Sequence, residues 1–160
     1  MLVLGLDLSS SLTGWAIIND KQELVAFGKI ELSKYKKKKF PLEYIKVLYE
    51  EIQKIIKSYN PDKCVIEDTF ARNISTIKIL CRVRGIAEIA LINGGIYDIS
   101  LINASSARKR VFNSGKLTKE ECYELLKKKY PEQNFWNDGL DISDSIVLAL
   151  SSTYCASSMS

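Results

Sequence analysis

The sequence contains no histidine among its 160 residues. A histidine general base, a Ser-His-Asp or Cys-His catalytic group, and a zinc site with histidine ligands are therefore excluded. If the protein is an enzyme, its acid–base or metal chemistry has to use carboxylates, lysines, tyrosines or cysteines.

Long hydrophobic runs and paired cysteines are also missing. No segment reaches 18 apolar residues without a charge or a turn signal, and Asp7 interrupts the apolar N-terminal segment. We therefore expect neither a signal peptide nor a membrane span. The four cysteines are far apart, and no C-x-x-C pair indicates a zinc site or a redox dithiol. We expect a reduced, soluble, cytoplasmic protein.

What is present is the composition of an ordinary globular protein, 46% hydrophobic and 26% charged, in a chain long enough for one domain over residues 1–160.

Three short apolar runs joined by polar turns predict an antiparallel meander of strands. The order strand, helix, strand, helices that follows predicts an α/β fold, one mixed sheet with helices on its faces. A polar, basic stretch separates the last strand from the next helix. The expected strands cover residues 2–8, 15–18, 24–32, 64–67 and 96–102, and the expected helices 42–59, 73–92, 118–130 and 141 onward.

Four carboxylates lie where acidic residues are uncommon. Asp7 ends an otherwise apolar strand, and Glu67 ends the apolar run before it. Asp141 and Asp144 are three residues apart at the start of the last helix, so they project from one face. Taken alone, Asp141 is better explained as a helix N-cap. For Glu67, a strand-end pair with Asp68 that faces solvent is an open alternative. Asp7 has no such explanation, because an acid buried in a central strand needs a partner or a cation.

Converging carboxylates without histidine are the donor set that Mg²⁺ requires. Hard cations take oxygen ligands, and two such ions can stabilise both the attacking and the leaving oxygen of a phosphodiester. A pair of carboxylates that share a proton, as in an aspartic protease, is conceivable. Four acids fit a site with two metal ions better.

The sequence resembles the RuvC family of Holliday-junction resolvases, within the ribonuclease-H-like superfamily. Four blocks in the same order carry the resemblance: GLDLSSSLTGWAI, VIEDTF, ARNISTIKILCRVRGIA and DISDSIVLAL. The chain departs from the pattern at Leu8 and Ser9, where many members have Pro-Gly, and at Ser145, where Ala is usual. The matching positions are Asp7, Ser10, Thr13, Gly14, Glu67, Asn73, Arg84, Gly85, Asp141 and Asp144.

The resemblance implies a five-stranded mixed sheet flanked by helices and a Mg²⁺-dependent, structure-selective endodeoxyribonuclease that acts on four-way and other branched DNA. Asp7, Glu67, Asp141 and Asp144 would then hold two Mg²⁺ ions, for which Mn²⁺ substitutes. One ion would generate a hydroxide, and the other would stabilise the leaving 3′ oxygen, so the products would be a 5′ phosphate and a 3′ hydroxyl. Short length and many lysines point to a phage of a low-GC bacterium.

The net charge of +4 hides a segregation of the 23 Lys and Arg residues. Most lie in the segments 34–39, 72–84, 108–119 and 127–129, which flank the proposed acidic site. The resemblance places Arg108, Lys109 and Lys119 where the family has its catalytic-side lysines, with the alignment uncertain by a residue or two, and we favour Lys109 and Lys119 for catalytic roles. The last segment is better explained as a solvated helix end. The expected DNA contacts are Lys36, Lys37, Lys38, Phe70, Arg72, Asn73, Lys78, Arg82, Arg108, Lys109, Arg110, Lys116 and Lys119.

Two of these expectations have open alternatives. Phe70 follows Glu67 where the family uses an aromatic residue that stacks on bases, but it could equally anchor its loop in the core. The helix 73–92 is apolar over more than one stripe, so it needs a second buried contact. In the family this helix forms the homodimer interface. A helix buried entirely in its own core is the alternative, although a domain this small makes it less favoured.

Three other functions compete with a resolvase. A ribonuclease-H-like nuclease could act on RNA or RNA–DNA hybrids, as RuvC-related rRNA-processing nucleases do. A non-catalytic junction-binding protein would use its acids structurally. A sugar-kinase-like ATPase would need a second, similar domain, which 160 residues cannot supply.

Overall fold

The computed structural model describes residues 1–35, 42–68, 73–134 and 139–154. Its sheet has five strands in the order β3-β2-β1-β4-β5. The first three strands form the expected antiparallel meander, and β4 and β5 are added parallel to β1. The mixed five-stranded sheet is therefore confirmed. The strands are β1 (Leu2–Asp7), β2 (Leu12–Asn19), β3 (Leu24–Glu31), β4 (Lys63–Glu67) and β5 (Asp98–Ile102).

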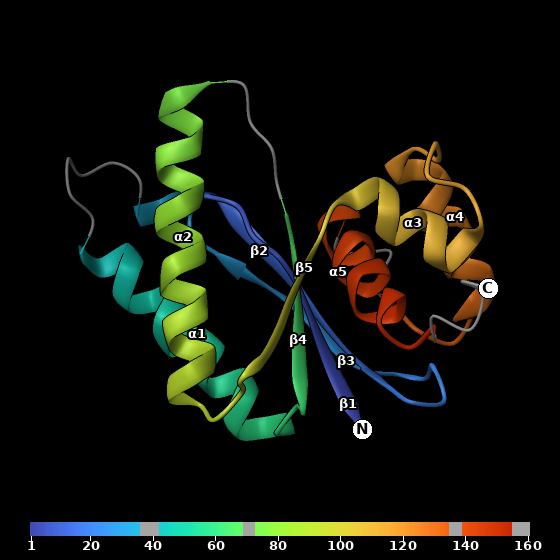
Figure 1. Ribbon diagram of the computed structural model, residues 1–160, viewed down its shortest axis with the longest axis horizontal. Helices are drawn as coiled ribbons and strands as arrows, with labels where there is room; N and C mark the ends of the chain where they lie inside the picture. The colour runs from blue at the N-terminus through green and yellow to red at the C-terminus, as the bar shows by residue number, and fades with distance from the viewer. Residues whose placement is uncertain (36–41, 69–72, 135–138, 155–160) are drawn as a thin grey trace.

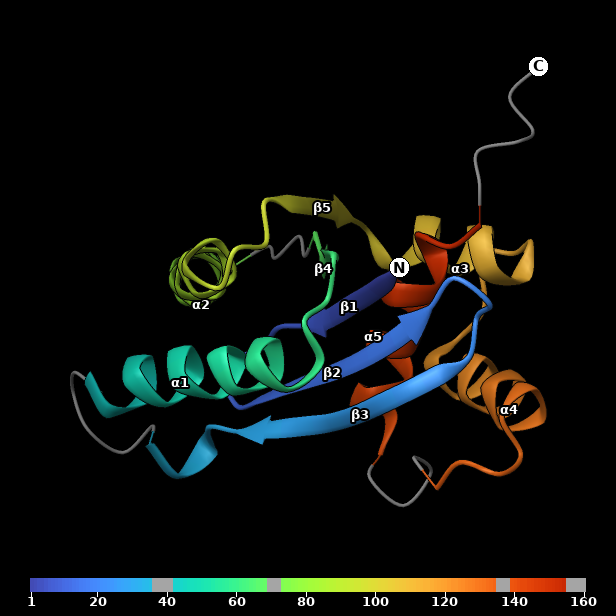
Figure 2. The same ribbon diagram turned by 90° about the horizontal axis from the view of Figure 1, so that it is seen from below.

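Helices cover both faces of this sheet (Figures 1 and 2). One face is covered by α1 (Leu42–Tyr59) and α2 (Ile74–Asn93), with the short 3-10 helix η1 (Ser33–Tyr35) at its edge. The other face is covered by α3 (Ala104–Phe112), α4 (Lys119–Lys129) and α5 (Leu140–Ser151). Within the described residues, no helix is long and apolar enough to cross a membrane.

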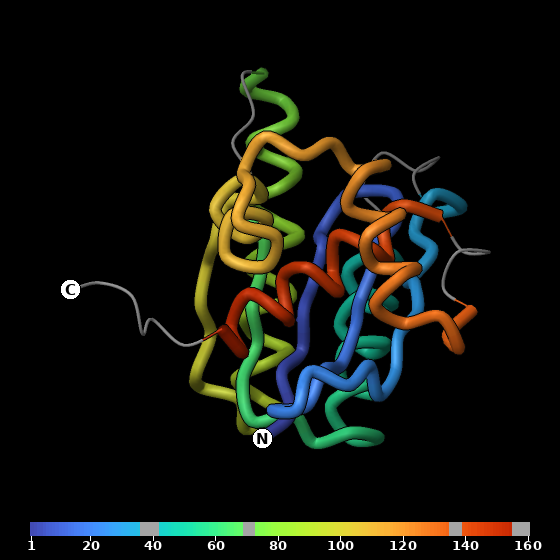
Figure 3. The backbone as a smooth tube through the Cα atoms, turned by 90° about the vertical axis from the view of Figure 1, so that its right-hand side faces the viewer, coloured from blue at the N-terminus to red at the C-terminus, as the bar shows by residue number. Residues whose placement is uncertain are grey.

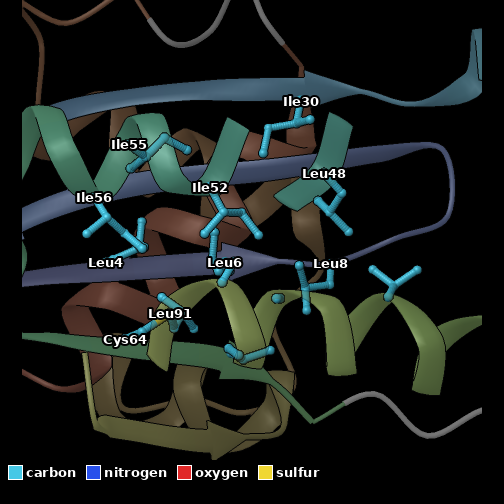
Figure 4. Close-up of a cluster of buried hydrophobic side chains, with 14 of the residues drawn as sticks. Leu4, Leu6, Leu8, Ile30, Leu48, Ile52, Ile55, Ile56, Cys64 and Leu91 are labelled. Carbon is cyan, nitrogen blue, oxygen red and sulfur yellow. The ribbon is translucent and has the colours of Figure 1, made fainter. Parts of the chain in front are cut away.

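The face toward α1 and α2 buries the larger of two hydrophobic clusters. Alternation along β1 directs Leu4, Leu6 and Leu8 to this side. There they meet Leu48 and Ile52 of α1 (Figure 4). This packing fixes the end of β1, and so the position of Asp7 on the opposite face.

The opposite face of the sheet is built for close approach of α5, which lies across β1 and β2 (Figure 3). A Cβ on Gly5 would lie 2.1 Å from the carbonyl oxygen of Ser145, and one on Gly14 would lie 2.3 Å from that of Asp141. Only glycine fits at these two contacts. The helix that carries two of the four acids is therefore held directly against the strand that carries Asp7.

The helix α3 was not expected, because the segment after β5 is polar and basic. Of its nine residues only Ala107 is buried, so no apolar periodicity marks it. Its boundaries are nonetheless encoded locally. The side chain of Asn103 caps the first turn by accepting a hydrogen bond from the backbone N–H of Ser106, and Asn113 ends the helix in the left-handed conformation, with φ of 60°.

The turn after β1 tolerates the departure from the family's Pro-Gly. The Ser9 hydroxyl accepts a hydrogen bond from the backbone N–H of Leu12 at 3.0 Å and donates one to the Leu12 carbonyl at 2.6 Å. The Ser9 side chain thus closes the turn through hydrogen bonds to the backbone of Leu12.

Candidate active site

Three carboxylates from three elements meet at one edge of the sheet. Asp7 is the last residue of β1, and Glu67 is the last residue of the neighbouring parallel strand β4. Because the two strands pair with Leu6 beside Ile66, their carboxyl ends lie side by side. Asp144, on the second turn of α5, approaches from the helix that covers this face and is 6% exposed.

Burial and like charge together raise the pKa of Asp7 to about 8. Burial is the largest cause, followed by the negative charges of Glu67 and Asp144, and a side-chain hydrogen bond with Glu67 acts in the same direction. The positive charge of Lys119 opposes them and lowers the pKa. A cation bound here would offset the burial and the repulsion from the two neighbouring acids, which together disfavour the ionised form of Asp7.

Two positively charged side chains approach Asp144, one from α3 and one from the first residue of α4. The ammonium group of Lys119 forms an ion pair with its Oδ2, and a guanidinium nitrogen of Arg108 lies 3.5 Å from its Oδ1. Burial lowers the pKa of Lys119, but the hydrogen bond to Asp144 and the surrounding negative charges raise it above the ordinary value overall. Lys119 is therefore charged at neutral pH.

Asp141 lies in the first turn of α5 and is partly buried. Gly139 occupies the N-cap position, so the interpretation of Asp141 as the helix N-cap is wrong. Its backbone carbonyl contacts Gly14, which pairs with Asp7 in the β1–β2 ladder. The fold thus brings all four acids to one region, and the electrostatic contacts of Asp7 connect three of them.

These carboxylates do not form a finished metal site. Within the described part of the chain, no three acidic or cysteine side chains converge closely enough to hold an ion as they lie. Asp7 is hydrogen-bonded to Glu67, while Asp144 is paired with Lys119 and Arg108. The donor set is nevertheless the one a hard divalent cation requires, because it consists of carboxylate oxygens whose mutual repulsion is unrelieved at Asp7.

The basic residues predicted to contact DNA lie on both sides of Glu67. Glu67 shares a surface depression with Leu80, Cys81 and Arg84 of α2, and a second with Arg108 of α3. Other predicted contacts are exposed on both helices and the loop after α3, although Arg82 borders the groove between α1 and α2. These are Lys78 and Arg82 on α2, Lys109 and Arg110 on α3, and Lys116 in the loop.

The two lysines given catalytic roles differ in position. Lys119 reaches the carboxylates, whereas Lys109 is exposed on α3, and the residue of α3 beside Asp144 is its neighbour Arg108. Asn73 caps α2, with its side chain accepting a hydrogen bond from the backbone N–H of Ser75 at 2.8 Å. Five other expected DNA contacts lie outside the described residues: Lys36, Lys37, Lys38, Phe70 and Arg72.

Arg84, a position of the RuvC motif that is not among the named DNA contacts, joins α2 to the end of β4. Its guanidinium group lies 3.3 Å from Asp68, next to Glu67, and 3.0 Å from Glu88 one helical turn away. The spacing of Arg84 and Glu88 by four residues is a sequence signal for an ion pair on a helix. The contact with Asp68 has no comparable local signal, because it joins separate elements.

The model of the family described as crossover junction endodeoxyribonuclease RuvC matches residues 3–152 of the chain. The chain belongs to the RuvC family. The RuvC of Lawsonia intracellularis is 30% identical over 152 residues, covering 92% of this chain and 87% of that protein. The RuvC of Caldicellulosiruptor saccharolyticus is 27% identical over 171 aligned positions, covering 99% and 96%.

Solved RuvC and viral resolvase structures share the fold. Thermus thermophilus RuvC in complex with a Holliday junction substrate superposes with a TM-score of 0.81 at 13% identity, covering 96% of this chain and 94% of that one. Fowlpox virus resolvase in complex with a Holliday junction gives 0.59 at 20% identity, covering 96% and 97%. The ribonuclease-H-like fold expected from the RuvC motifs is therefore confirmed.

Proposed function

We propose that this RuvC-family chain is a Mg²⁺-dependent, structure-selective endodeoxyribonuclease that resolves Holliday junctions and other branched DNA. The observation that carries the proposal is the meeting of Asp7, Glu67 and Asp144 from β1, β4 and α5, with Lys119 and Arg108 beside them. The RuvC relatives and the resolvases solved with junction DNA support this substrate class. On this proposal the chain works as one nuclease domain.

The four acids would hold two Mg²⁺ ions, with Mn²⁺ as a substitute. Bound at this site, such ions would supply positive charge to the attacking and leaving oxygens of a phosphodiester. Attack of water on phosphorus with cleavage of the P–O3′ bond would leave a 5′ phosphate and a 3′ hydroxyl. Burial of Asp7 and Asp144 keeps their carboxylates desolvated, so each carboxylate gains more from a cation than it would in water. Asp141, in the first turn of the same helix as Asp144, would complete the ligand set.

The basic residues would bring the scissile phosphate to the carboxylates. Lys119 is half-exposed and charged, so it can contact both Asp144 and an approaching phosphate oxygen. Glu67 lines one depression with Arg84 of α2 and another with Arg108 of α3, and the exposed cations of these two helices would hold the phosphates of the flanking duplexes. A branched substrate can contact both helices at once.

A homodimer through α2 would place two such sites on one junction. Large apolar side chains remain exposed along this helix, including Ile74 at 70% and Ile89 at 54%. Every described residue from Asn73 to Ile79 is exposed, so the first two turns of α2 stand clear of the sheet. An apolar surface of this kind indicates a protein contact. A two-fold dimer suits a four-way junction, because both have two equivalent halves.

Direct competition between substrates tests the proposed substrate class. The protein is incubated with Mg²⁺ and a labelled four-way junction, a linear duplex of matched sequence, and an RNA–DNA hybrid of equal length. We expect symmetric incision of the junction and little cleavage of the other two. Preferred cleavage of the hybrid would support the ribonuclease alternative. Tight junction binding without cleavage, at any concentration of Mg²⁺ or Mn²⁺, would support the non-catalytic one.

A further inference from the structure

The segment between α3 and α4 folds back over α3 instead of extending into solvent. Asn113 turns the chain with a φ of 60°, and the next glycine, Gly115, lies so close to α3 that a Cβ there would be 2.8 Å from the Ser105 carbonyl oxygen. The loop 113–118 therefore packs against the start of α3, next to the acidic site.

Arg108 ties this loop to α5. One guanidinium nitrogen donates a hydrogen bond to the Leu117 carbonyl at 3.0 Å, and another lies 3.5 Å from Oδ1 of Asp144. The side chain is only 15% exposed. Because a guanidinium group carries its donors on separate nitrogens of a rigid planar fork, it holds two acceptors at a fixed separation, whereas the donors of a lysine all sit on one rotating nitrogen.

The N-terminus of α4 is fixed by a second pair of hydrogen bonds, which does not involve Arg108. The Thr118 hydroxyl accepts a hydrogen bond from the backbone N–H of Glu121 at 3.2 Å, and the Glu121 carboxylate accepts one from the backbone N–H of Thr118 at 2.7 Å. Lys119 is the next residue along the chain. Its backbone thus lies within the capping box that joins Thr118 to Glu121, two residues after the Leu117 carbonyl that Arg108 holds.

We infer that Arg108 is a positioning residue: by holding the Leu117 carbonyl and Asp144 together, it sets Lys119 beside the carboxylates. The inference rests on the proposed function, because the consequence of misplacing Lys119 is a slower incision. Its low exposure separates Arg108 from its neighbours Lys109 and Arg110, which are exposed on the same helix and suited to phosphate contacts.

A double-mutant cycle tests whether Arg108 acts through Lys119. Single-turnover incision rates are measured for Arg108→Gln, Lys119→Gln and the double variant, with Lys57→Gln on the far end of α1 as the charge control. We expect Arg108→Gln to slow incision by roughly tenfold and to add nothing further in the Lys119→Gln background. The dissociation constant for a junction, measured with Ca²⁺ in place of Mg²⁺, should stay within about twofold of the wild-type value.

Two results would overturn the inference. Multiplicative losses in the double variant would mean that Arg108 acts on the substrate directly, as would a junction dissociation constant that rises as much as the rate falls. The conservative variant Arg108→Lys adds a further check, because it keeps the charge but replaces the two guanidinium nitrogens that contact Leu117 and Asp144 with a single nitrogen. We expect its incision rate to stay close to that of Arg108→Gln, and full activity in Arg108→Lys would mean that charge alone matters.

A second measurement needs no nuclease activity and so separates this inference from the proposed function. A lysine-specific protease cuts after Lys116 only when the loop opens, and replacing Arg108 neither adds nor removes a cleavage site. We expect faster cleavage at this bond in Arg108→Gln than in the wild type or Lys57→Gln, at temperatures where far-UV circular dichroism shows all three folded. Equal rates of proteolysis would contradict the inference that Arg108 holds the loop in place. A wild-type protein that does not incise the junction would contradict only the proposed function.

Discussion

Gly5 of β1 lies directly against the backbone carbonyl of Ser145 on α5, so close that a Cβ would be 2.1 Å from the oxygen. The spacing between the strand that ends in Asp7 and the helix that carries Asp144 therefore depends on the absence of a side chain. Close packing of the two backbones thus sets the relative position of Asp7 and Asp144, independently of the contacts that their side chains make.

Gly5→Ala should destabilise the fold and the site together. The added methyl group meets backbone atoms that cannot rotate away, so we expect a loss of about 2 kcal/mol in the free energy of unfolding. Thermal unfolding followed by circular dichroism measures this loss. Because α5 has to move outward, the incision rate should fall as well. An unchanged melting temperature would show that α5 does not pack as closely as described.

Asp7→Asn should stabilise the protein in the absence of metal. The pKa of Asp7 is raised to about 8 in the folded state, so between the unfolded value near 3.9 and this value the folded chain binds a proton that the unfolded chain has released. The free energy of unfolding therefore falls as the pH rises through this window. Asparagine cannot ionise and escapes the loss.

Melting temperatures measured in EDTA from about pH 5 to about pH 8 test this linkage. We expect the advantage of Asp7→Asn over the wild type to grow with pH across the range. A difference that stays constant, or that shrinks toward high pH, would contradict the burial of an ionisable group at this position.

Divalent ions should stabilise the wild type and fail to stabilise the Asp7→Asn variant. An ion that binds only the folded state at about ten times its dissociation constant adds about 1.4 kcal/mol. Differential scanning calorimetry at increasing MgCl₂ measures the effect, with NaCl of matched ionic strength as the control. Equal shifts in both proteins would indicate nonspecific ion binding.

Ile89→Glu should break a homodimer formed through α2. The side chain is 54% exposed in the single chain, so the charge costs the monomer little but cannot be buried against a second copy. Sedimentation equilibrium should give twice the chain mass of 18.1 kDa for the wild type and the single mass for the variant. Leu125→Glu on α4, at a residue 36% exposed, is the matched control. Dimers of both variants, or of neither, would place the interface elsewhere.

The strands and long helices could be predicted because their apolar residues repeat with the correct period. The expected helix 42–59 matches α1 residue for residue, and the expected helix 73–92 differs from α2 by one residue at each end. Helix α3 was missed because it buries only Ala107. Its position is set by Asn103, Asn113 and the packing of Gly115, which leave no periodic pattern.

The same omission explains why the sequence could not select among the consecutive cations after β5. Successive residues on a helix point about 100° apart, so only one of Arg108, Lys109 and Arg110 can face the carboxylates. Choosing it requires the helical phase, which remained unknown for a segment taken as irregular. The acids were easier to find, because Asp7 ends an apolar strand where burial alone makes a carboxylate exceptional.

The most direct test of the proposed site is the single-turnover incision of a labelled four-way junction in Mg²⁺ by the wild type, Asp7→Asn and Lys57→Gln. All three proteins are first shown to be folded and to bind the junction in Ca²⁺. We predict incision by the wild type and Lys57→Gln that leaves a 5′ phosphate and a 3′ hydroxyl. Asp7→Asn should cut at least about a thousandfold more slowly. Undiminished incision by Asp7→Asn would contradict a metal site built on the carboxylates of β1, β4 and α5.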